Sequence, residues 1–251
     1  MGQSLVTTDF VYSNQPITME GYHTDDSIFD RIVTNQTFYE EKLLEKARSL
    51  NLEGVYVDIG ANIGNHSIFF NRFCNATKVY SFEIDETIFA ILKKNMELNC
   101  SEDSYHLGEI GILDRKGLVD LSDINHLNAG MTKIVNVEGS KREVDTLDNV
   151  LRGVDNIALI KIDVEGFERH IVQGANHILE NQSPVIFAEL ATKEEFNSFN
   201  DAVSKFGYTT DRVNHAGTPT YLFTKGKISV WTNIKQSAKR LYWGMKDKLR
   251  K

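Results

Sequence analysis

The 251-residue sequence lacks the features that mark membrane and secreted proteins. It has no run of about 18 or more apolar residues, which excludes a transmembrane helix. Its first residues, MGQSLVTTDFVYS, show no basic patch followed by an apolar run, the pattern of a secretion signal. The two cysteines, Cys74 and Cys100, then indicate reduced, packed thiols. These absences predict a cytoplasmic protein.

Several catalytic motifs are missing as well. The seven histidines do not cluster at ligand spacing, and no Cys/His zinc site is present. No serine stands in a G-x-S-x-G turn, which argues against an α/β-hydrolase. The hydrophobic content of 41% and the charged content of 25% are those of a globular protein with one main domain.

The most informative segment present is VYVDIGANIG, residues 55–64. Three β-forming residues lead into Asp58, and a loop then holds Gly60, Asn62 and Gly64 ahead of an apolar, helix-like run. Glycine lets the backbone turn sharply and lets a ligand approach the free N–H groups of a helix start. The pattern predicts a cofactor-binding loop.

A second strand supports that prediction. VYSFEID, residues 79–85, delivers Glu83, which falls 25 residues after Asp58, about the spacing at which a carboxylate meets a ribose. The loop departs from the dinucleotide pattern G-x-G-x-x-G, and a carboxylate at Asp58 would repel a diphosphate. The carboxylate of Asp58 instead suits a cationic amino group, such as that on the methionine end of S-adenosylmethionine (SAM). Charge complementarity therefore favours SAM over NAD. The alternatives are a helix N-cap for Asp58 and a solvated strand end for Glu83.

The apolar pattern alternates between strands and helices. The expected strands are 55–58, 79–83, 157–162 and 184–190, and the expected helices are 63–73, 86–98, 166–181 and 193–206, preceded by a helix over 37–50 with Thr37 as its cap. This order predicts an α/β fold, a mostly parallel sheet with helices on both faces. Segments 208–213 and 220–224 are expected to form a terminal antiparallel hairpin.

Three regions are expected along the chain. Residues 1–36 show few helix signals and are interpreted as an N-terminal extension, 37–226 as the main domain, and 227–251 as a basic amphipathic helix. Within the main domain, 105–144 breaks the alternation and is expected to hold one strand and an inserted hairpin or loop. VDTLDNVL, residues 144–151, then predicts a short helix capped by Asp145 or Thr146.

A second chemical cluster is IKIDVEGFE, residues 160–168. Because ligands of open α/β sheets bind beyond the carboxyl ends of the strands, four acids are expected at one rim: Asp58, Glu83, Asp163 and Glu189. Their repulsion must be relieved by a cationic ligand, a metal or hydrogen bonds. For Asp163 and Glu165 three interpretations stay open: a general base, ligands of a divalent ion, or helix capping with pairing to Lys161 or Arg169.

These motifs carry a family resemblance. VYVDIGANIGNHSIFF, VYSFEIDETIFAILKKNMELN, VDTLDNVL, IALIKIDVEGFERHIVQGA and PVIFAEL occur in the order typical of the FkbM family of SAM-dependent methyltransferases. The resemblance runs from about residue 40 to 190. It implies a Rossmann-like class I methyltransferase fold and O-methylation of hydroxyls, commonly on sugars, glycans or polyketides. It further implies that Asp58, Gly60, Asn62 and Gly64 hold the methionine side of SAM, that Glu83 binds the ribose, and that Asp163 and Glu165 edge the acceptor site.

The distribution of charge along the chain indicates which partners the protein could bind. Residues 225–251 carry a net charge of +8 and residues 1–224 a net charge of −15. Apolar residues from Trp231 to Leu249 recur at helical spacing, so 228–251 suits either an anionic membrane surface or docking on the acidic body. Nucleic-acid binding is not expected, because no aromatic platform accompanies the charge.

The sequence thus predicts a cytoplasmic SAM-dependent O-methyltransferase for a carbohydrate hydroxyl, with contact at the inner membrane face as one option. Its acceptor could instead be a small secondary metabolite or peptide. From another class, the chain could be a SAM-binding or membrane-associated module without turnover. No metal requirement follows from the sequence.

Overall fold

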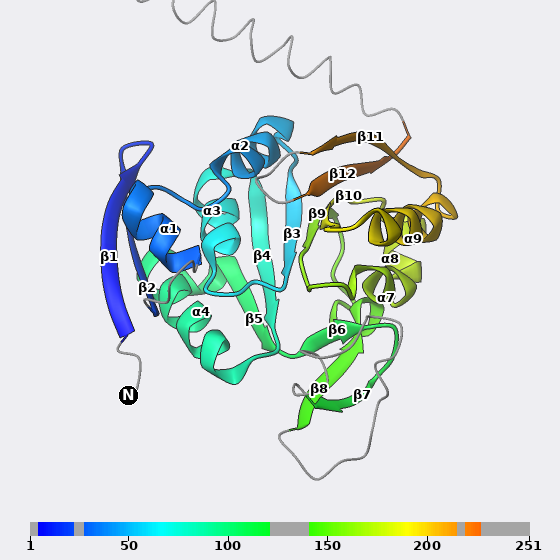
Figure 1. Ribbon diagram of the computed structural model, residues 1–251, viewed down its shortest axis with the longest axis horizontal. Coiled ribbons are helices and arrows are strands. Elements are labelled where there is room, and N and C mark those ends of the chain that lie inside the picture. Colours follow the sequence, from blue (N-terminus) through cyan, green and yellow to red (C-terminus); the bar gives the residue numbers. More distant parts are fainter. Residues whose placement is uncertain (1–4, 23–27, 121–140, 215–218, 227–251) are drawn as a thin grey trace, which may run out of the picture.

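A seven-stranded sheet forms the centre of the computed structural model, which describes residues 5–22, 28–120, 141–214 and 219–226 (Figure 1). Its strand order is β11-β12-β10-β9-β3-β4-β5. The strands are β3 (Gly54–Ile59), β4 (Ala76–Glu83), β5 (Tyr105–Glu109), β9 (Ile157–Ile162), β10 (Val185–Glu189), β11 (Tyr208–Asn214) and β12 (Thr220–Lys225). Five neighbouring strands, from β10 to β5, are parallel, and β12 runs opposite to both of its neighbours. The predicted α/β class and terminal hairpin are confirmed.

Helices cover both faces of this sheet. One face packs on α2 (Glu41–Leu50), α3 (Asn65–Phe73) and α4 (Glu86–Asn99); the other packs on α6 (Leu147–Val150), α7 (Glu168–Gln173), α8 (Asn176–Asn181) and α9 (Lys193–Ser204). Alternate residues of a strand point to opposite faces of the sheet. Tyr56 packs in the core beneath α2, α3 and α4, whereas Val55 and Val57 pack in the core beneath α6 to α9. Because both faces are covered, the central strands read as continuous apolar runs.

The N-terminal residues form a hairpin of β1 (Leu5–Tyr12) and β2 (Gln15–Tyr22), followed by α1 (Ile28–Asn35), a helix that the sequence had not predicted. Two buried asparagines of α4 hold β2. Asn99 accepts from the N–H of Thr18 (3.0 Å) and donates to its carbonyl (2.6 Å). Asn95 does the same for Glu20 (2.6 and 2.9 Å) and also donates to the carbonyl of Ile63 in the glycine loop (2.8 Å). The hairpin is therefore tied to the loop through one side chain.

Two helix predictions were wrong in their boundaries. The helix expected over 37–50 begins at Glu41, because Glu40 adopts a left-handed conformation (φ 56°) at its start, and Thr37 is not its cap. The helix expected over 166–181 divides into α7 and α8 at Gly174. A side chain at Gly174 would lie 2.1 Å from the carbonyl oxygen of Leu113, so the chain must pass close to that neighbouring segment.

The irregular segment contains more strand than expected. After β5, a separate three-stranded sheet forms from β6 (Gly111–Leu113), β7 (Gly117–Asp120) and β8 (Lys141–Thr146), in the order β6-β8-β7. The helix expected from residue 144 is shorter, since β8 occupies its start and α6 follows. Thr146 caps α6 by accepting from the N–H of Asn149, as one of the two predicted caps.

The basic segment 227–251 lies outside the described residues, so the amphipathic helix and its membrane contact stay predictions. Among the residues that are described, no helix is long and apolar enough to cross a bilayer.

Candidate functional site

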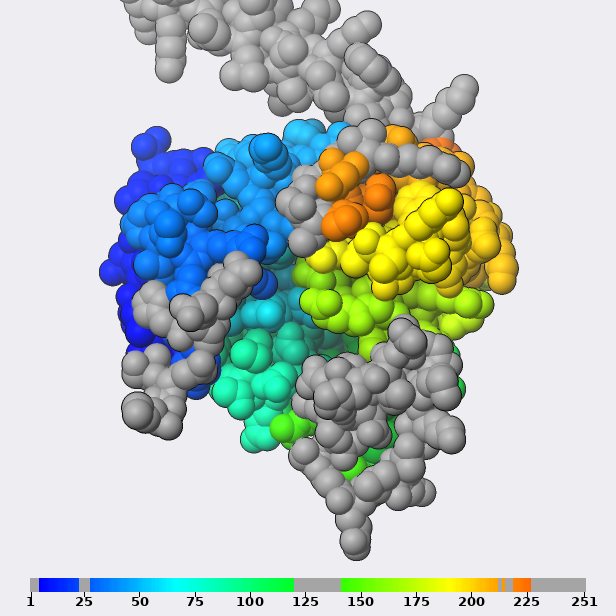
Figure 2. All heavy atoms as spheres, viewed as in Figure 1, coloured from blue at the N-terminus to red at the C-terminus, as the bar shows by residue number. Residues whose placement is uncertain are grey.

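A cavity of about 340 Å³ lies at the carboxyl ends of β3, β4 and β9. Figure 2 shows the surface hollowed between the teal α4 region and the yellow-green α7 region. Its lining residues are Ile28, Gly60, Asn62, Glu83, Ile84, Gly111, Ile112, Leu113, Val119, Val144, Asp163, Val164, Glu165 and Phe167. The lining brings together both sequence clusters, the glycine loop with Glu83 and the segment that follows β9.

The glycine loop is held in a tight, left-handed geometry. Gly60 (φ 73°), Asn62 (φ 49°) and Gly64 (φ 90°) all have positive φ. The N–H groups of Gly60 and Ala61 both donate to the carbonyl of Phe82 at the end of β4 (3.1 and 3.0 Å). A Cβ on Gly60 would lie 1.9 Å from the carbonyl oxygen of Asp163, so only glycine allows these two strand ends to meet.

The carboxylate of Glu83 is fixed by backbone donors. Its Oε2 accepts from the N–H of Asn62 (2.9 Å), and its Oε1 accepts from the N–H groups of Ile84 and Asp85 (2.8 and 3.0 Å). Burial raises the pKa of Glu83 above its ordinary value, and these three hydrogen bonds oppose that rise. The side chain thus joins the two strand ends and presents a carboxylate to the cavity.

Asp58 takes a different position from the one that the sequence suggested. It is fully buried and is absent from the cavity lining. Its Oδ2 accepts from Ser67 (2.6 Å), and its Oδ1 lies 3.2 Å from the ammonium of Lys161. The structure therefore places Asp58 beneath the loop, and its predicted contact with a cofactor stays a prediction.

Lys161 is a functional candidate that the sequence analysis had named only as a pairing partner. Its buried ammonium donates to the carbonyl of Gly60 (3.0 Å) and pairs with both Asp58 (3.2 Å) and Asp163 Oδ2 (3.4 Å). Burial alone lowers the pKa of Lys161, but the two carboxylates outweigh it, and the net shift is upward. One cation thus joins the glycine loop to the end of β9.

Asp163 and Glu165 border the cavity from the β9 side. The side chain of Asp163 is 25% exposed. In the described part of the chain its Oδ2 pairs with Lys161 and its Oδ1 makes no hydrogen bond. Glu165 is exposed and left-handed (φ 53°). Arg169, the other expected partner, donates instead to Ser198 (3.3 Å).

The repulsion expected among four rim acids is relieved by the protein itself. Lys161 pairs with both Asp58 and Asp163, which leaves these three groups with one net negative charge, and backbone N–H groups stabilise Glu83. Glu189, at the end of β10, is absent from the cavity lining. Among the described residues, no group of three or more His, Cys, Asp and Glu is arranged to hold a metal ion.

The opposite wall of the cavity is apolar and comes from segments that the sequence analysis had not assigned to the site. The small sheet contributes Ile112, Val119 and Val144, and α1 contributes Ile28. The apolar alternation of these strands could have been noticed, but their position over the cavity depends on how the small sheet packs. A flat, apolar ligand group would bury its surface here.

Glu168, the last residue of the IKIDVEGFE segment, supports the loop that carries Glu165. Its buried carboxylate accepts from the N–H of Gly166 (2.9 Å) and, more weakly, from that of Val164 (3.4 Å). Burial raises the pKa of Glu168 to about 7, with the backbone hydrogen bonds acting in the opposite direction. The folded protein therefore binds this proton more tightly than the unfolded chain does.

That raised pKa predicts a stability difference that depends on pH. The contribution of protonated Glu168 to the free energy of unfolding is complete below the pKa that Glu168 has in the unfolded chain. This contribution is lost as pH rises through about 7, the pKa of Glu168 in the folded protein. Between about pH 4.5 and pH 8 the wild type should lose about 3 kcal/mol relative to Glu168→Gln, whose amide can still accept from Gly166. Urea unfolding of both proteins across this range measures the difference. The exposed Glu194→Gln is the control, and parallel curves for wild type and Glu168→Gln would contradict the prediction.

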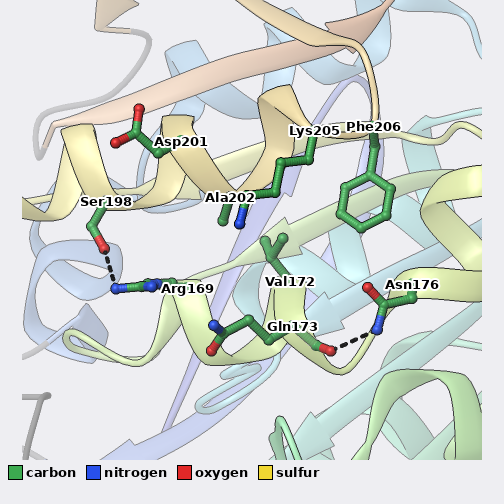
Figure 3. A pocket seen from close by; sticks show the side chains of 9 residues that line it. All are labelled: Arg169, Val172, Gln173, Asn176, Ser198, Asp201, Ala202, Lys205 and Phe206. Carbon is green, nitrogen blue, oxygen red and sulfur yellow. Dashed lines mark hydrogen bonds between the residues drawn. The ribbon is translucent and has the colours of Figure 1, made fainter.

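A separate groove of about 160 Å³ lies between α7 and α9 (Figure 3). Val172, Ala202 and Phe206 form its apolar part, while Arg169 and Lys205 stand at its polar side. None of the strand-end acids lines it. The groove is therefore distinct from the candidate site.

Comparisons with known proteins identify the family and the fold. Residues 58–217 match the methyltransferase FkbM domain. The methyltransferase sdnD of Sordaria araneosa is 25% identical over 154 residues, which are 48% of this chain and 60% of that protein, so the chain spans less than two thirds of this relative. The crystal structure of methyltransferase FkbM from Methylobacillus flagellatus KT has a TM-score of 0.52 at 16% identity, covering 69% of this chain and 44% of the other. The structural likeness shows the class I, Rossmann-like fold.

Proposed function

The chain belongs to the FkbM family of methyltransferases, and we propose that it uses SAM to methylate a hydroxyl group of a sugar or glycan. The observation that carries the proposal is the cavity at the strand ends. It is bordered by the glycine loop and Glu83 on one side and by Asp163 and Glu165 on the other. A cofactor and a hydroxyl acceptor can therefore meet at one edge of the sheet.

The residues present fit SAM. Gly60 and Asn62 place the glycine loop along the cavity, and the carboxylate of Glu83 is an acceptor suited to the hydroxyls of a ribose. The apolar wall with Ile84 and Ile112 suits an adenine ring. The ammonium and sulfonium charges of SAM would face the carboxylates of this rim. When bound, SAM supplies a methyl group made electrophilic by its sulfonium.

The remaining chemistry belongs to the protein. A hydroxyl is a poor nucleophile at neutral pH, so a base must accept its proton during the transfer. Asp163 is the candidate, because its Oδ2 is held by Lys161 while Oδ1 is without a hydrogen-bond partner in the described chain. Lys161 orients this carboxylate. Positioning of the hydroxyl in line with the methyl group supplies much of the remaining rate.

Calorimetric titration of the purified protein with SAM and with NAD tests the cofactor. Micromolar binding of SAM is expected, with a dissociation constant on the order of 10 μM, and binding should be lost in Glu83→Ala. The exposed Glu86→Ala is the control for removal of a nearby carboxylate. A preference for NAD, or no binding of SAM, would refute the proposed cofactor.

Conservative variants test the proposed base with neutral methyl glycosides as acceptors. Asp163→Asn should lower the turnover number by about 10² or more while SAM still binds. Glu165→Gln should have a smaller effect, since Glu165 is exposed. Methyl transfer at the wild-type rate in Asp163→Asn would exclude Asp163 as the base.

A further inference from the structure

The N-terminal hairpin meets the glycine loop at Asn95, a fully buried side chain of α4. The family match covers residues 58–217, so the hairpin lies outside it. Within the loop, Ile63 stands between Asn62, which lines the cavity, and Gly64, the N-cap of α3. The amide of Asn95 donates to the carbonyl of Ile63 (2.8 Å). A side chain outside the cavity thus holds the backbone that borders it.

The carbonyl of Ile63 is one that the hydrogen bonds of α3 leave out. The carbonyl of Gly64 accepts from the N–H of Ile68 (2.9 Å) and so belongs to the helix. Ile63 precedes this cap, and its carbonyl takes the hydrogen bond of Asn95 instead. Because Ile63 is buried, loss of that donor would leave its carbonyl in an unfavourable, unpaired state. The conformation of the loop therefore depends on Asn95.

A chain of hydrogen bonds leads from Ile63 to the cavity. The N–H of Ile63 donates to Oδ1 of Asn62 (2.7 Å), and the N–H of Asn62 donates to Oε2 of Glu83 (2.9 Å). Asn62 is left-handed (φ 49°), a conformation that persists in a non-glycine residue only when its surroundings impose it. A movement of Ile63 would therefore disturb both Asn62 and the hydrogen bond that fixes Glu83.

The hairpin sets the orientation of the Asn95 amide. Its Oδ1 accepts from the N–H of Glu20 (2.6 Å), and its Nδ2 donates to the carbonyl of Glu20 (2.9 Å). Only one of the two orientations of an amide can satisfy both backbone groups. In this orientation the second hydrogen of Nδ2 reaches Ile63, whereas the reversed amide would turn Oδ1 toward the carbonyl of Ile63. Strand β2 thus determines that the loop meets a donor.

Asn99, one turn further along α4, provides an internal comparison. It makes the same pair of hydrogen bonds with Thr18 of β2 (3.0 and 2.6 Å). Its amide also donates to the carbonyl of Asn95 within the helix (2.7 Å), where Asn95 donates to Ile63. The two asparagines hold β2 alike and differ in the contact with the loop.

We propose that Asn95 is a positioning residue for SAM binding, which couples docking of the N-terminal hairpin to the geometry of the glycine loop. The proposal rests on the proposed function and deepens it by making the hairpin part of the cofactor site. Asn95 acts through Ile63 and Asn62 on the carboxylate of Glu83. Because such coupling is reciprocal, the docked hairpin favours bound SAM, and bound SAM favours the docked hairpin.

Calorimetric titration with SAM compares Asn95→Ala with Asn99→Ala in the full chain, below the unfolding temperature of each variant. Both variants should lose thermal stability, because each leaves two backbone groups of β2 without their partner. We expect the dissociation constant of SAM to rise by about tenfold or more in Asn95→Ala and by less than about twofold in Asn99→Ala. A role in stability alone would not separate the two variants.

Hydrogen exchange of the wild-type protein measures the coupling without any substitution. Residues 15–22 of β2 report on the hairpin, and residues 220–225 of β12, on the opposite side of the sheet, report on stabilisation of the whole protein. Saturating SAM should slow exchange in β2 by about threefold or more beyond its effect on β12. In Asn95→Ala this difference should disappear, and in Asn99→Ala it should remain.

The proposal is overturned if SAM binds equally well to Asn95→Ala and Asn99→Ala, or if SAM slows exchange equally in β2 and β12 of the wild type. If Asn95→Ala does not fold, the exchange of the wild type decides alone. A wild-type protein that fails to bind SAM would instead refute the proposed function, so the two failures are distinguishable.

Discussion

Replacement of Lys161 by methionine is expected to lower the free energy of unfolding by about 3–5 kcal/mol. Methionine fills most of the same volume but removes the charge that pairs with Asp58 and Asp163. Asp58 is fully buried, so its carboxylate would be left with Ser67 as its remaining donor. The cost of an uncompensated buried charge exceeds that of the lost hydrogen bond to Gly60.

Urea unfolding compares this variant with Lys205→Met, a control at an exposed lysine beyond α9. The control should change stability by about 0.5 kcal/mol or less. The double variant Asp58→Asn/Lys161→Met removes the unpaired charge and should recover part of the loss, about 1 kcal/mol or more. If Lys161→Met were as stable as Lys205→Met, the ion-pair network would not hold the two strand ends together.

Replacement of Gly60 by alanine should have the second large effect, on both ligand binding and stability. The new Cβ would lie 1.9 Å from the carbonyl oxygen of Asp163, and the loop cannot withdraw without breaking its two hydrogen bonds to Phe82. Overpacking and a left-handed alanine together should cost about 3 kcal/mol. We expect SAM affinity to fall by about a hundredfold or more, because the loop must move away from its binding geometry.

Gly153→Ala separates the clash from the backbone strain. Gly153 has a similar φ of 81°, but no heavy atom lies within 4 Å of a Cβ placed there. Its alanine variant should cost about 1 kcal/mol from strain alone and leave SAM affinity unchanged. Calorimetry and urea unfolding of both variants measure the two effects. A Gly60→Ala protein that matched Gly153→Ala in both would show that the close approach to Asp163 is not required.

The alternation of apolar runs was sufficient to predict the central sheet. IALIKI and PVIFAEL form β9 and β10, buried on both faces, and the acids that end these strands follow from the chain direction in a parallel sheet. Local rules gave Thr146 as one of two candidate caps of α6, and Thr146 is the cap; the cap predicted at Thr37 was wrong. They failed where a distant contact decided the outcome. Gly174 divides a helix because it packs on the carbonyl of Leu113.

The sequence by itself determined the α/β class, the glycine loop and the presence of Glu83, Asp163 and Glu165 at strand ends, because each depends on neighbours in the chain. Only the tertiary structure decided which of these side chains meet and what neutralises them. It placed Asp58 beneath the loop with Lys161, and it set Ile28 and the small sheet over the cavity. It also tied the N-terminal hairpin to the glycine loop through Asn95. These contacts join segments that are far apart in the chain. Burial and charge pairing select such contacts, and both act through space rather than along the sequence.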